Sequence, residues 1–178
     1  MYQYGIPLSV RIIEKALPSE AAVSVIMGSR SDWKTVQPCC DLLEQMAVTF
    51  EYGVLSAHRT PKRLAAYVPN LQYRGIQILI ACAGGSAHLP GMCAAETFIP
   101  VLGFGPTNEK FGPMDVIGSC VRMPAGVPLA LMGLDNAGAI NAALHAVSIL
   151  SLNDNNLRSR YVEYIQNQTN SVPFSAHD

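Results

Sequence analysis

Three short motifs, each placed directly after an apolar run of strand length, constrain this chain more than any other feature. They are Gly28–Asp32 (GSRSD), Ser56–Pro61 (SAHRTP) and Ala83–His88 (AGGSAH). In an open parallel sheet, the residues just past the carboxyl ends of the strands line one crevice, where such folds bind ligands. The motifs therefore predict that histidines, an arginine, an aspartate, serines and glycines meet in space. That combination is typical of a site for a phosphorylated substrate with an acid–base group.

Apolar runs and helical patterns alternate along the chain with short connections, which indicates an α/β fold built on a parallel sheet. We expect helices at 32–46, 61–75, 90–97, 114–121, 136–150 and 155–168, and strands at 23–27, 49–55, 76–81, 99–103 and 129–132. Thr60 is expected to cap the second helix, with Pro61 at its first position. Pro38 is expected to distort the first turns of its helix, because it lacks an N–H.

The length of 178 residues suits a single domain. We interpret residues 1–21 as an N-terminal extension, 22–169 as one catalytic α/β domain that includes the last helix, and 170–178 as a disordered tail. The charged fraction is 14%, below the usual value of about 25%, while 49% of the residues are hydrophobic. So apolar a chain favours an oligomer. The small residues of 137–143 allow close helix packing, either within one subunit or between subunits.

Composition also excludes several classes of function. The net charge is -1 without a cluster of Lys or Arg, which argues against a nucleic-acid partner. The apolar stretches are too short or too interrupted for a transmembrane helix, and charges among the first 21 residues argue against a signal peptide. We therefore expect a cytoplasmic protein that does not contact a membrane.

Neither a metal nor a cofactor is expected. The five cysteines form no C-x-x-C pair, which argues against a disulfide framework and a zinc site and predicts buried thiols. The chain lacks the phosphate loop of nucleoside triphosphatases and the dinucleotide-binding fingerprint. What remains is acid–base chemistry on a phosphorylated small molecule.

The first motif has two interpretations. A strand that turns into a helix leaves free backbone N–H groups and a positive dipole end, which attract an anion. The hydroxyls of Ser29 and Ser31 add donors there, and the Asp32 carboxylate suits ribose hydroxyls. The same residue types are ordinary helix caps, so phosphate binding and capping both remain open.

The second motif is more informative. Arg59 can grip a phosphate with two hydrogen bonds, and Ser56 can donate beside it. His58 lies just before a helix N-terminus, which favours a neutral imidazole that exchanges protons near pH 7. A structural role for a lone histidine is the alternative.

The third motif brings backbone close to a ligand. Gly84 and Gly85 follow a buried strand, where glycine lets the main chain approach a flat heterocycle; a positive φ at the turn would explain them equally well. His88 is either a second proton-handling group or a residue that orients the loop.

Five collinear segments resemble one known family. They are the three motifs above together with MPAGVP at 123–128 and AGAINAAL at 137–144. From Val23 to the last helix, the chain is similar to the class I N5-carboxyaminoimidazole ribonucleotide mutases, the PurE family of purine biosynthesis. The resemblance implies a three-layer α/β/α, flavodoxin-like subunit in a homo-octamer. It also implies a mutase that moves a carboxyl group from the exocyclic nitrogen to ring carbon C4, by decarboxylation to trapped CO2 and recarboxylation, without ATP, metal or biotin.

The resemblance also implies roles for individual residues. His58 and His88 are the expected catalytic pair, with His58 shuttling the proton. Ser29, Ser31 and Arg59 would hold the 5′-phosphate, and Asp32 the ribose hydroxyls. The base and the CO2 site would be surrounded by Ser56, Gly84, Gly85, Ser86, Ala87, His88 and Leu89.

The chain departs from the family pattern at a few positions, and two other functions stay open. Ser86 stands where the family commonly has Ala, Gly103–Pro106 replaces an apolar-Pro run, and the 105–113 loop diverges. One alternative is the class II activity, which carboxylates aminoimidazole ribonucleotide with free CO2. The histidine in AGGSAH favours the mutase, because carboxylase relatives lack it. The other alternative is a non-catalytic nucleotide- or flavin-binding module on the same fold.

Overall fold

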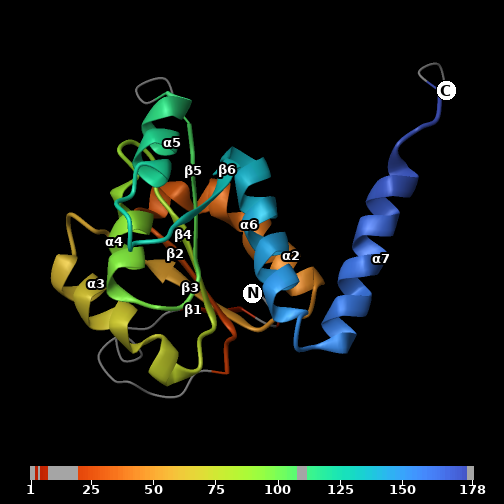
Figure 1. Cartoon of the computed structure of the whole chain (residues 1–178), viewed down its shortest axis with the longest axis horizontal. Helices are drawn as coiled ribbons and strands as arrows, with labels where there is room; N and C mark the ends of the chain where they lie inside the picture. The colour runs from red at the N-terminus through yellow and green to blue at the C-terminus, as the bar shows by residue number, and fades with distance from the viewer. Residues whose placement is uncertain (1–2, 4, 8–19, 108–111, 176–178) are drawn as a thin grey trace.

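One parallel sheet of six strands, in the order β1-β3-β2-β4-β5-β6, organises the computed structural model of the chain (Figure 1). The structure describes residues 3, 5–7, 20–107 and 112–175. The strands are β1 Gly5–Pro7, β2 Val23–Met27, β3 Phe50–Val54, β4 Ile78–Cys82, β5 Val101–Gly105 and β6 Ala130–Leu134. Every pair of neighbouring strands in this sheet is parallel, as the alternation of apolar runs and helical patterns predicted.

Helices cover both faces of the sheet (Figure 1). One face carries α2 (Trp33–Gln45) and α6 (Asp135–Leu150), and the other carries α3 (Pro61–Tyr67), α4 (His88–Glu96) and α5 (Pro113–Val121). Alternate residues of β2 separate the two cores: Val25 packs toward α2 and α6, whereas Ile26 packs toward α3 and α4. The predicted three-layer α/β/α, flavodoxin-like fold is therefore confirmed.

The predicted elements differ from the observed ones at several points. Strand β1 was not predicted; it forms the edge of the sheet and pairs with β3, with Gly5 opposite Phe50. The helix predicted at 61–75 ends at Tyr67 and continues as the 3-10 turns Val68–Asn70 and Gln72–Arg74, because Pro69 has no N–H to extend the α-helical ladder. Helix α2 runs through Pro38, whose missing N–H removes one intrahelical bond.

Two further expectations need correction. Thr60 occupies the position before α3, but its side chain does not cap the helix. Its hydroxyl instead donates to the Ser56 carbonyl oxygen at 2.9 Å and accepts from the Ser56 N–H at 3.0 Å. The last helix, α7 (Asn155–Ser171), extends into the segment 170–178 that was expected to be a disordered tail; residues 176–178 lie outside the described residues.

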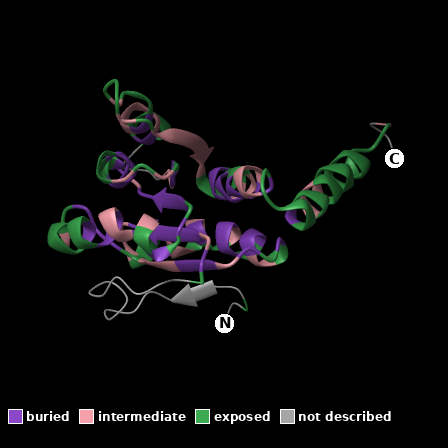
Figure 2. Cartoon of the chain, turned by 60° about the horizontal axis from the view of Figure 1, so that its bottom comes forward, coloured by how far each residue is buried: buried purple, intermediate pink, exposed green. Residues whose placement is uncertain are grey.

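Helix α7 stands away from the body of the subunit and is exposed along most of its length (Figures 1 and 2). Leu157 in its first turn is 3% exposed and joins the core beneath α2 and α6. Farther along, Val162 and Ile165 are 46% and 47% exposed. The helix thus presents apolar side chains that the described part of the chain leaves uncovered. None of the described helices combines the length and apolar character needed to cross a membrane.

A buried polar network joins β3 to the segment that leads into β4. Arg74 donates to both carboxylate oxygens of Glu51, from Nη1 at 2.9 Å and from Nη2 at 2.5 Å. The Tyr67 hydroxyl donates to Glu51 Oε1 at 2.5 Å, and its oxygen lies 2.7 Å from Ser24 Oγ. Glu51 and Arg74 are 1% and 3% exposed. Burial, followed by the neighbouring Glu51 carboxylate, raises the pKa of Tyr67, so the phenol keeps its proton.

The substitution Arg74→Met tests how much this network stabilises the fold. It keeps the length of the side chain but removes the guanidinium from which both Glu51 oxygens accept. Breaking a buried ion pair from one side is strongly unfavourable, so we expect the free energy of unfolding to fall by about 3–5 kcal/mol in urea denaturation. Arg63→Met on the exposed surface of α3 is the matched control, with an expected change within about 0.5 kcal/mol. Equal losses at both positions would contradict the prediction.

Gly105, at the end of β5, is a position where only glycine fits. A Cβ there would lie 2.0 Å from the Ala83 carbonyl oxygen, far inside van der Waals contact. Main chain on both sides of the clash leaves no flexible group to move. The end of β5 is thereby held against the end of β4.

We therefore expect Gly105→Ala to prevent normal folding, measured as loss of soluble protein or of a cooperative thermal transition. Gly118 in the middle of α5 is the matched control, because a Cβ there has nothing within 4 Å. Gly118→Ala should raise the free energy of unfolding by about 0.5–1 kcal/mol, since glycine is unfavourable within a helix. A stable, native-like Gly105→Ala protein would show that the close approach is unimportant.

Candidate functional site

The three sequence motifs follow three neighbouring strands that end level with one another. Met27, the last residue of β2, pairs with Val54 of β3 on one side and with Cys82 of β4 on the other. The chain leaves β2 for β3 and then crosses to β4 on the opposite side. The motifs therefore meet at a switch point of the sheet, which is where open α/β folds bind ligands.

A cavity of about 440 Å³ lies at these strand ends, and we call it the strand-end cavity. Every residue expected in the site lines it except Ser31. The lining consists of Gly28, Ser29, Asp32, Ser56, Ala57, His58, Arg59, Ala83, Gly84, Gly85, Ser86, Ala87, His88, Leu89 and Pro106.

His58 and His88 meet in the strand-end cavity. Nε2 of His58 lies 2.9 Å from Nδ1 of His88, within hydrogen-bond distance. The two rings are edge-to-face, with an interplanar angle of 89°. Both side chains are exposed to solvent in the subunit. One ring can therefore pass a proton to the other while facing a ligand.

Arg59 links the ends of two strands. Its Nη2 donates to the Gly28 carbonyl oxygen at 2.9 Å and its Nε donates to Ser56 Oγ at 3.2 Å. The Arg59 backbone N–H also donates to Ser56 Oγ, at 3.2 Å. These bonds fix the guanidinium at the edge of the cavity. The remaining N–H donors of this cation are suited to an anionic group of a ligand.

The first motif forms a capping box, so the capping interpretation is observed directly. Asp32 Oδ2 accepts from the Ser29 N–H at 2.9 Å, and Ser29 Oγ accepts from the Ser31 N–H at 3.3 Å. The Ser31 hydroxyl donates to Ser29 Oγ at 2.9 Å. Burial raises the pKa of Asp32, against the opposing effects of hydrogen bonds from Ser29 and Ser31 and of the Arg59 charge.

The third motif turns sharply before α4. Gly85 and Ala87 both have positive φ, of 62° and 40°. The positive φ that was one explanation of the glycines is therefore present at Gly85. A Cβ at Gly84 would come 3.1 Å from Cγ of Pro106, which shows close packing of the glycine backbone on that ring. His88 is the first residue of α4, and Leu89 behind it is 2% exposed.

Four lining residues were not predicted. Gly28, Ala57 and Ala83 are small residues next to the predicted ones, and they were passed over because they carry no functional group. Pro106 follows β5, which lies one strand beyond the three motifs. The strand order, once known, places it on the same edge.

The described residues contain no group of three or more His, Cys, Asp or Glu arranged to hold a metal ion. All five cysteines are free and buried, as the composition indicated. Burial, and to a smaller extent the nearby Glu96 charge, raises the pKa of the Cys93 thiol to about 12. Such thiols are not nucleophiles at neutral pH.

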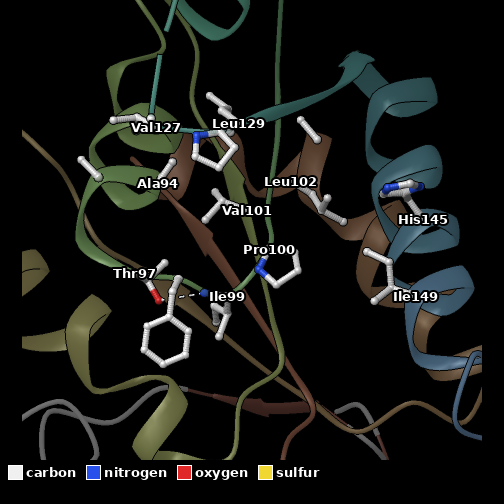
Figure 3. Close-up of a pocket in the computed structure, with 15 residues that line it drawn as sticks. Ala94, Thr97, Ile99, Pro100, Val101, Leu102, Val127, Leu129, His145 and Ile149 are labelled. Carbon is white, nitrogen blue, oxygen red and sulfur yellow. Dashed lines mark hydrogen bonds between the residues drawn. The ribbon is translucent and has the colours of Figure 1, made fainter. Parts of the chain in front are cut away.

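A second cavity, of about 770 Å³, lies near the amino ends of β5 and β6 (Figure 3). Most of the residues that line it are apolar, and Val127, Leu129 and Ile149 are typical of them. His145 projects from α6 at one side (Figure 3). No arginine or lysine lines this cavity, so it lacks the charge needed to hold a phosphate.

Comparisons with known proteins agree with the geometry. The family model described as AIR carboxylase matches residues 22–171. The N5-carboxyaminoimidazole ribonucleotide mutase of Pseudomonas aeruginosa is 45% identical over 85% of this chain and 93% of its own length. The Bacillus subtilis protein of the same name is 45% identical over 84% of this chain and 93% of its own length. The crystal structure of Treponema denticola PurE has a TM-score of 0.73 at 26% identity, and the match covers 83% of this chain and 91% of that one. The chain therefore belongs to the AIR carboxylase family.

Proposed function

We propose that this protein is an N5-carboxyaminoimidazole ribonucleotide mutase of purine biosynthesis. The observation that carries the proposal is the contact between His58 and His88 in the same cavity as the anchored guanidinium of Arg59. It combines a proton-transfer pair with a cation suited to a phosphate. The names of the curated relatives at 41–45% identity support this reaction and its pathway.

The ribonucleotide would bind across the strand ends. Arg59, with the hydroxyls of Ser29 and Ser31, holds the 5′-phosphate, and the Asp32 carboxylate accepts from the ribose hydroxyls. Ser31 reaches the ligand only if its hydroxyl turns away from Ser29 Oγ. The heterocycle then lies against Gly84 and Gly85, whose lack of side chains lets a flat ring approach the backbone.

The reaction separates into two steps. The bond between the exocyclic nitrogen and the carboxyl carbon breaks, its electron pair returns to nitrogen, and CO2 is released while nitrogen takes a proton from His58. Carbon C4 then attacks CO2, and His58 receives the C4 proton, which restores its starting state. His88, 2.9 Å away, accepts or donates a hydrogen bond as the proton moves.

The site must enclose CO2 between the two steps, so that it does not escape to solvent. Holding CO2 beside C4 turns a bimolecular step into one within the site and excludes water. The buried side chains of Ala87 and Leu89 supply an apolar wall, at 3% and 2% exposure. Ser86 lies between them and the glycines in the sequence, and this residue is exposed. The donors and acceptors of this mechanism all come from the protein and the substrate, so it uses no cofactor.

A homo-octamer is part of the proposal. The exposed apolar residues of α7 and the apolar second cavity both support burial of further surface between subunits. Most small residues of 137–143 lie on the interior side of α6: Ala139, Ala142 and Ala143 are fully buried against the core, whereas Ala137 is exposed. Their packing within one subunit leaves α7 and the second cavity as the surfaces for assembly. A cytoplasmic location is proposed because the reaction consumes a soluble ribonucleotide.

The class II reaction, direct carboxylation of aminoimidazole ribonucleotide by CO2, is the second candidate, and the description of the family model favours it. An assay with each substrate separates the two. The mutase converts the N-carboxylated ribonucleotide; turnover of aminoimidazole ribonucleotide with bicarbonate alone would assign the carboxylase instead.

The variant His58→Asn tests the acid–base role. The amide keeps a similar size but cannot exchange protons, so we expect kcat to fall by about 100-fold or more. Binding of aminoimidazole ribonucleotide, measured by calorimetry, should persist. His145→Asn, outside the strand-end cavity, is the matched control and should leave kcat unchanged. Near wild-type turnover by His58→Asn would remove His58 from the mechanism and support the non-catalytic module.

Arg59→Ala tests the phosphate site. Loss of a charge-assisted pair should raise KM by about 10- to 100-fold, with a smaller effect on kcat. Arg122→Ala, at an exposed position after α5, removes the same charge elsewhere. The phosphate assignment fails if Arg59→Ala and Arg122→Ala give the same KM in steady-state assays.

A further inference from the structure

Asp135 and Thr107 tie together the ends of the two strands that lie beyond the three motifs. The Thr107 N–H donates to Asp135 Oδ1 at 2.8 Å, and the Thr107 hydroxyl donates to Asp135 Oδ2 at 2.8 Å. Thr107 follows β5 by two residues, and Asp135 directly follows β6. Both carboxylate oxygens of Asp135 thus accept from Thr107, which lies 28 positions away in the chain.

The backbone of Asp135 is strained at this point. Its φ is 53°, in the left-handed region, although the residue is not glycine. That conformation costs roughly 1 kcal/mol for a residue with a Cβ, and aspartate is among the few that adopt it. Asp135 is exposed, so burial does not enforce the conformation. In this conformation its carboxylate accepts both hydrogen bonds from Thr107.

Thr107 is adjacent to a wall of the strand-end cavity. Pro106, the residue before it, lines the cavity and packs on Gly84, where a Cβ would come 3.1 Å from the proline Cγ. On the other side of Pro106, Gly105 is pressed against the Ala83 carbonyl oxygen. Pro106 is therefore fixed on one side by backbone contact and on the other by the Asp135–Thr107 pair.

We propose that Asp135 is a positioning residue that acts through Thr107 to hold Pro106 against Gly84. The pair keeps Pro106 in the wall of the strand-end cavity behind Gly84 and Gly85, and so retains CO2 after the first step. This inference rests on the proposed function. Its specific consequence concerns the fate of the intermediate, because a loosened wall lets CO2 escape and leaves aminoimidazole ribonucleotide as the product.

The test compares Asp135→Gly, Thr107→Val and Thr107→Ser with the wild type. Glycine adopts the left-handed conformation freely, so Asp135→Gly removes the hydrogen bonds without adding strain. Valine removes only the hydroxyl, and serine restores it. The measurement is the ratio of aminoimidazole ribonucleotide to C4-carboxylated product after complete conversion of the N-carboxylated substrate, corrected for its spontaneous decay.

We expect Asp135→Gly to raise this ratio by about tenfold and Thr107→Val by less, since small misplacements in a site have effects up to about 100-fold. Thr107→Ser should return the ratio to the wild-type value. Asp154→Gly is the matched control: Asp154 likewise lies at a helix N-terminus and accepts two hydrogen bonds, from the N–H groups of Asn156 and Leu157, but its helix is α7. It should lower thermal stability without changing the ratio.

Hydrogen exchange provides a readout that does not depend on turnover. We expect the amides of Gly84 and Gly85 to exchange faster in Asp135→Gly than in the wild type, and to be unaffected in Asp154→Gly. Unchanged exchange at these glycines would overturn the inference whether or not the protein is active. An unchanged product ratio in a working mutase would overturn it too, whereas a wild type inactive on the N-carboxylated substrate would overturn the proposed function.

Discussion

The level pairing of β2 with β3 and β4 is the constraint on which the site depends. A parallel sheet puts all carboxyl ends on one edge, but only strands that finish in register bring their following residues into contact. Met27 opposite both Val54 and Cys82 meets this condition. Arg59 can reach the Gly28 carbonyl, and His58 can reach His88, because the strands carrying them stop together. A slip of one residue in either pairing would separate these groups.

The site also relies on fixed backbone rather than on long side chains. Gly105 against the Ala83 carbonyl and Gly84 against Pro106 leave almost no space between β4 and β5 at this edge. The loop of Gly84 and Gly85 therefore packs on main chain that has no room to move away. The Arg59 guanidinium, in contrast, is held by only a carbonyl and a hydroxyl, so N–H donors remain for an anionic ligand. In the proposed binding mode, rigid backbone lies behind the heterocycle and the more adaptable Arg59 side chain lies at the phosphate.

Local patterns predicted the fold well and the long-range pairs poorly. Strand β2 matched its apolar run from Val23 to Met27, because a strand buried on both faces is almost continuously apolar. The roles of Asp32 and Thr60 were harder to predict, because each side chain can bond either to a neighbour in its own motif or to a more distant group. The pairs Glu51–Arg74 and Thr107–Asp135 were not predicted. Partners that lie 23 and 28 positions apart leave no periodic signal.

The buried pair of Glu51 and Arg74 has a consequence for how this chain can change over time. Loss of either residue alone leaves the other charge in an apolar surrounding, which is strongly destabilising, while replacement of both by apolar residues of similar volume is often neutral. The two positions are therefore coupled: each single substitution lowers the stability of the fold, whereas the double substitution need not. The Tyr67 hydroxyl, which donates to Glu51, extends this coupling to a third position. Substitutions can therefore remove the network without a large loss of stability only in concerted steps.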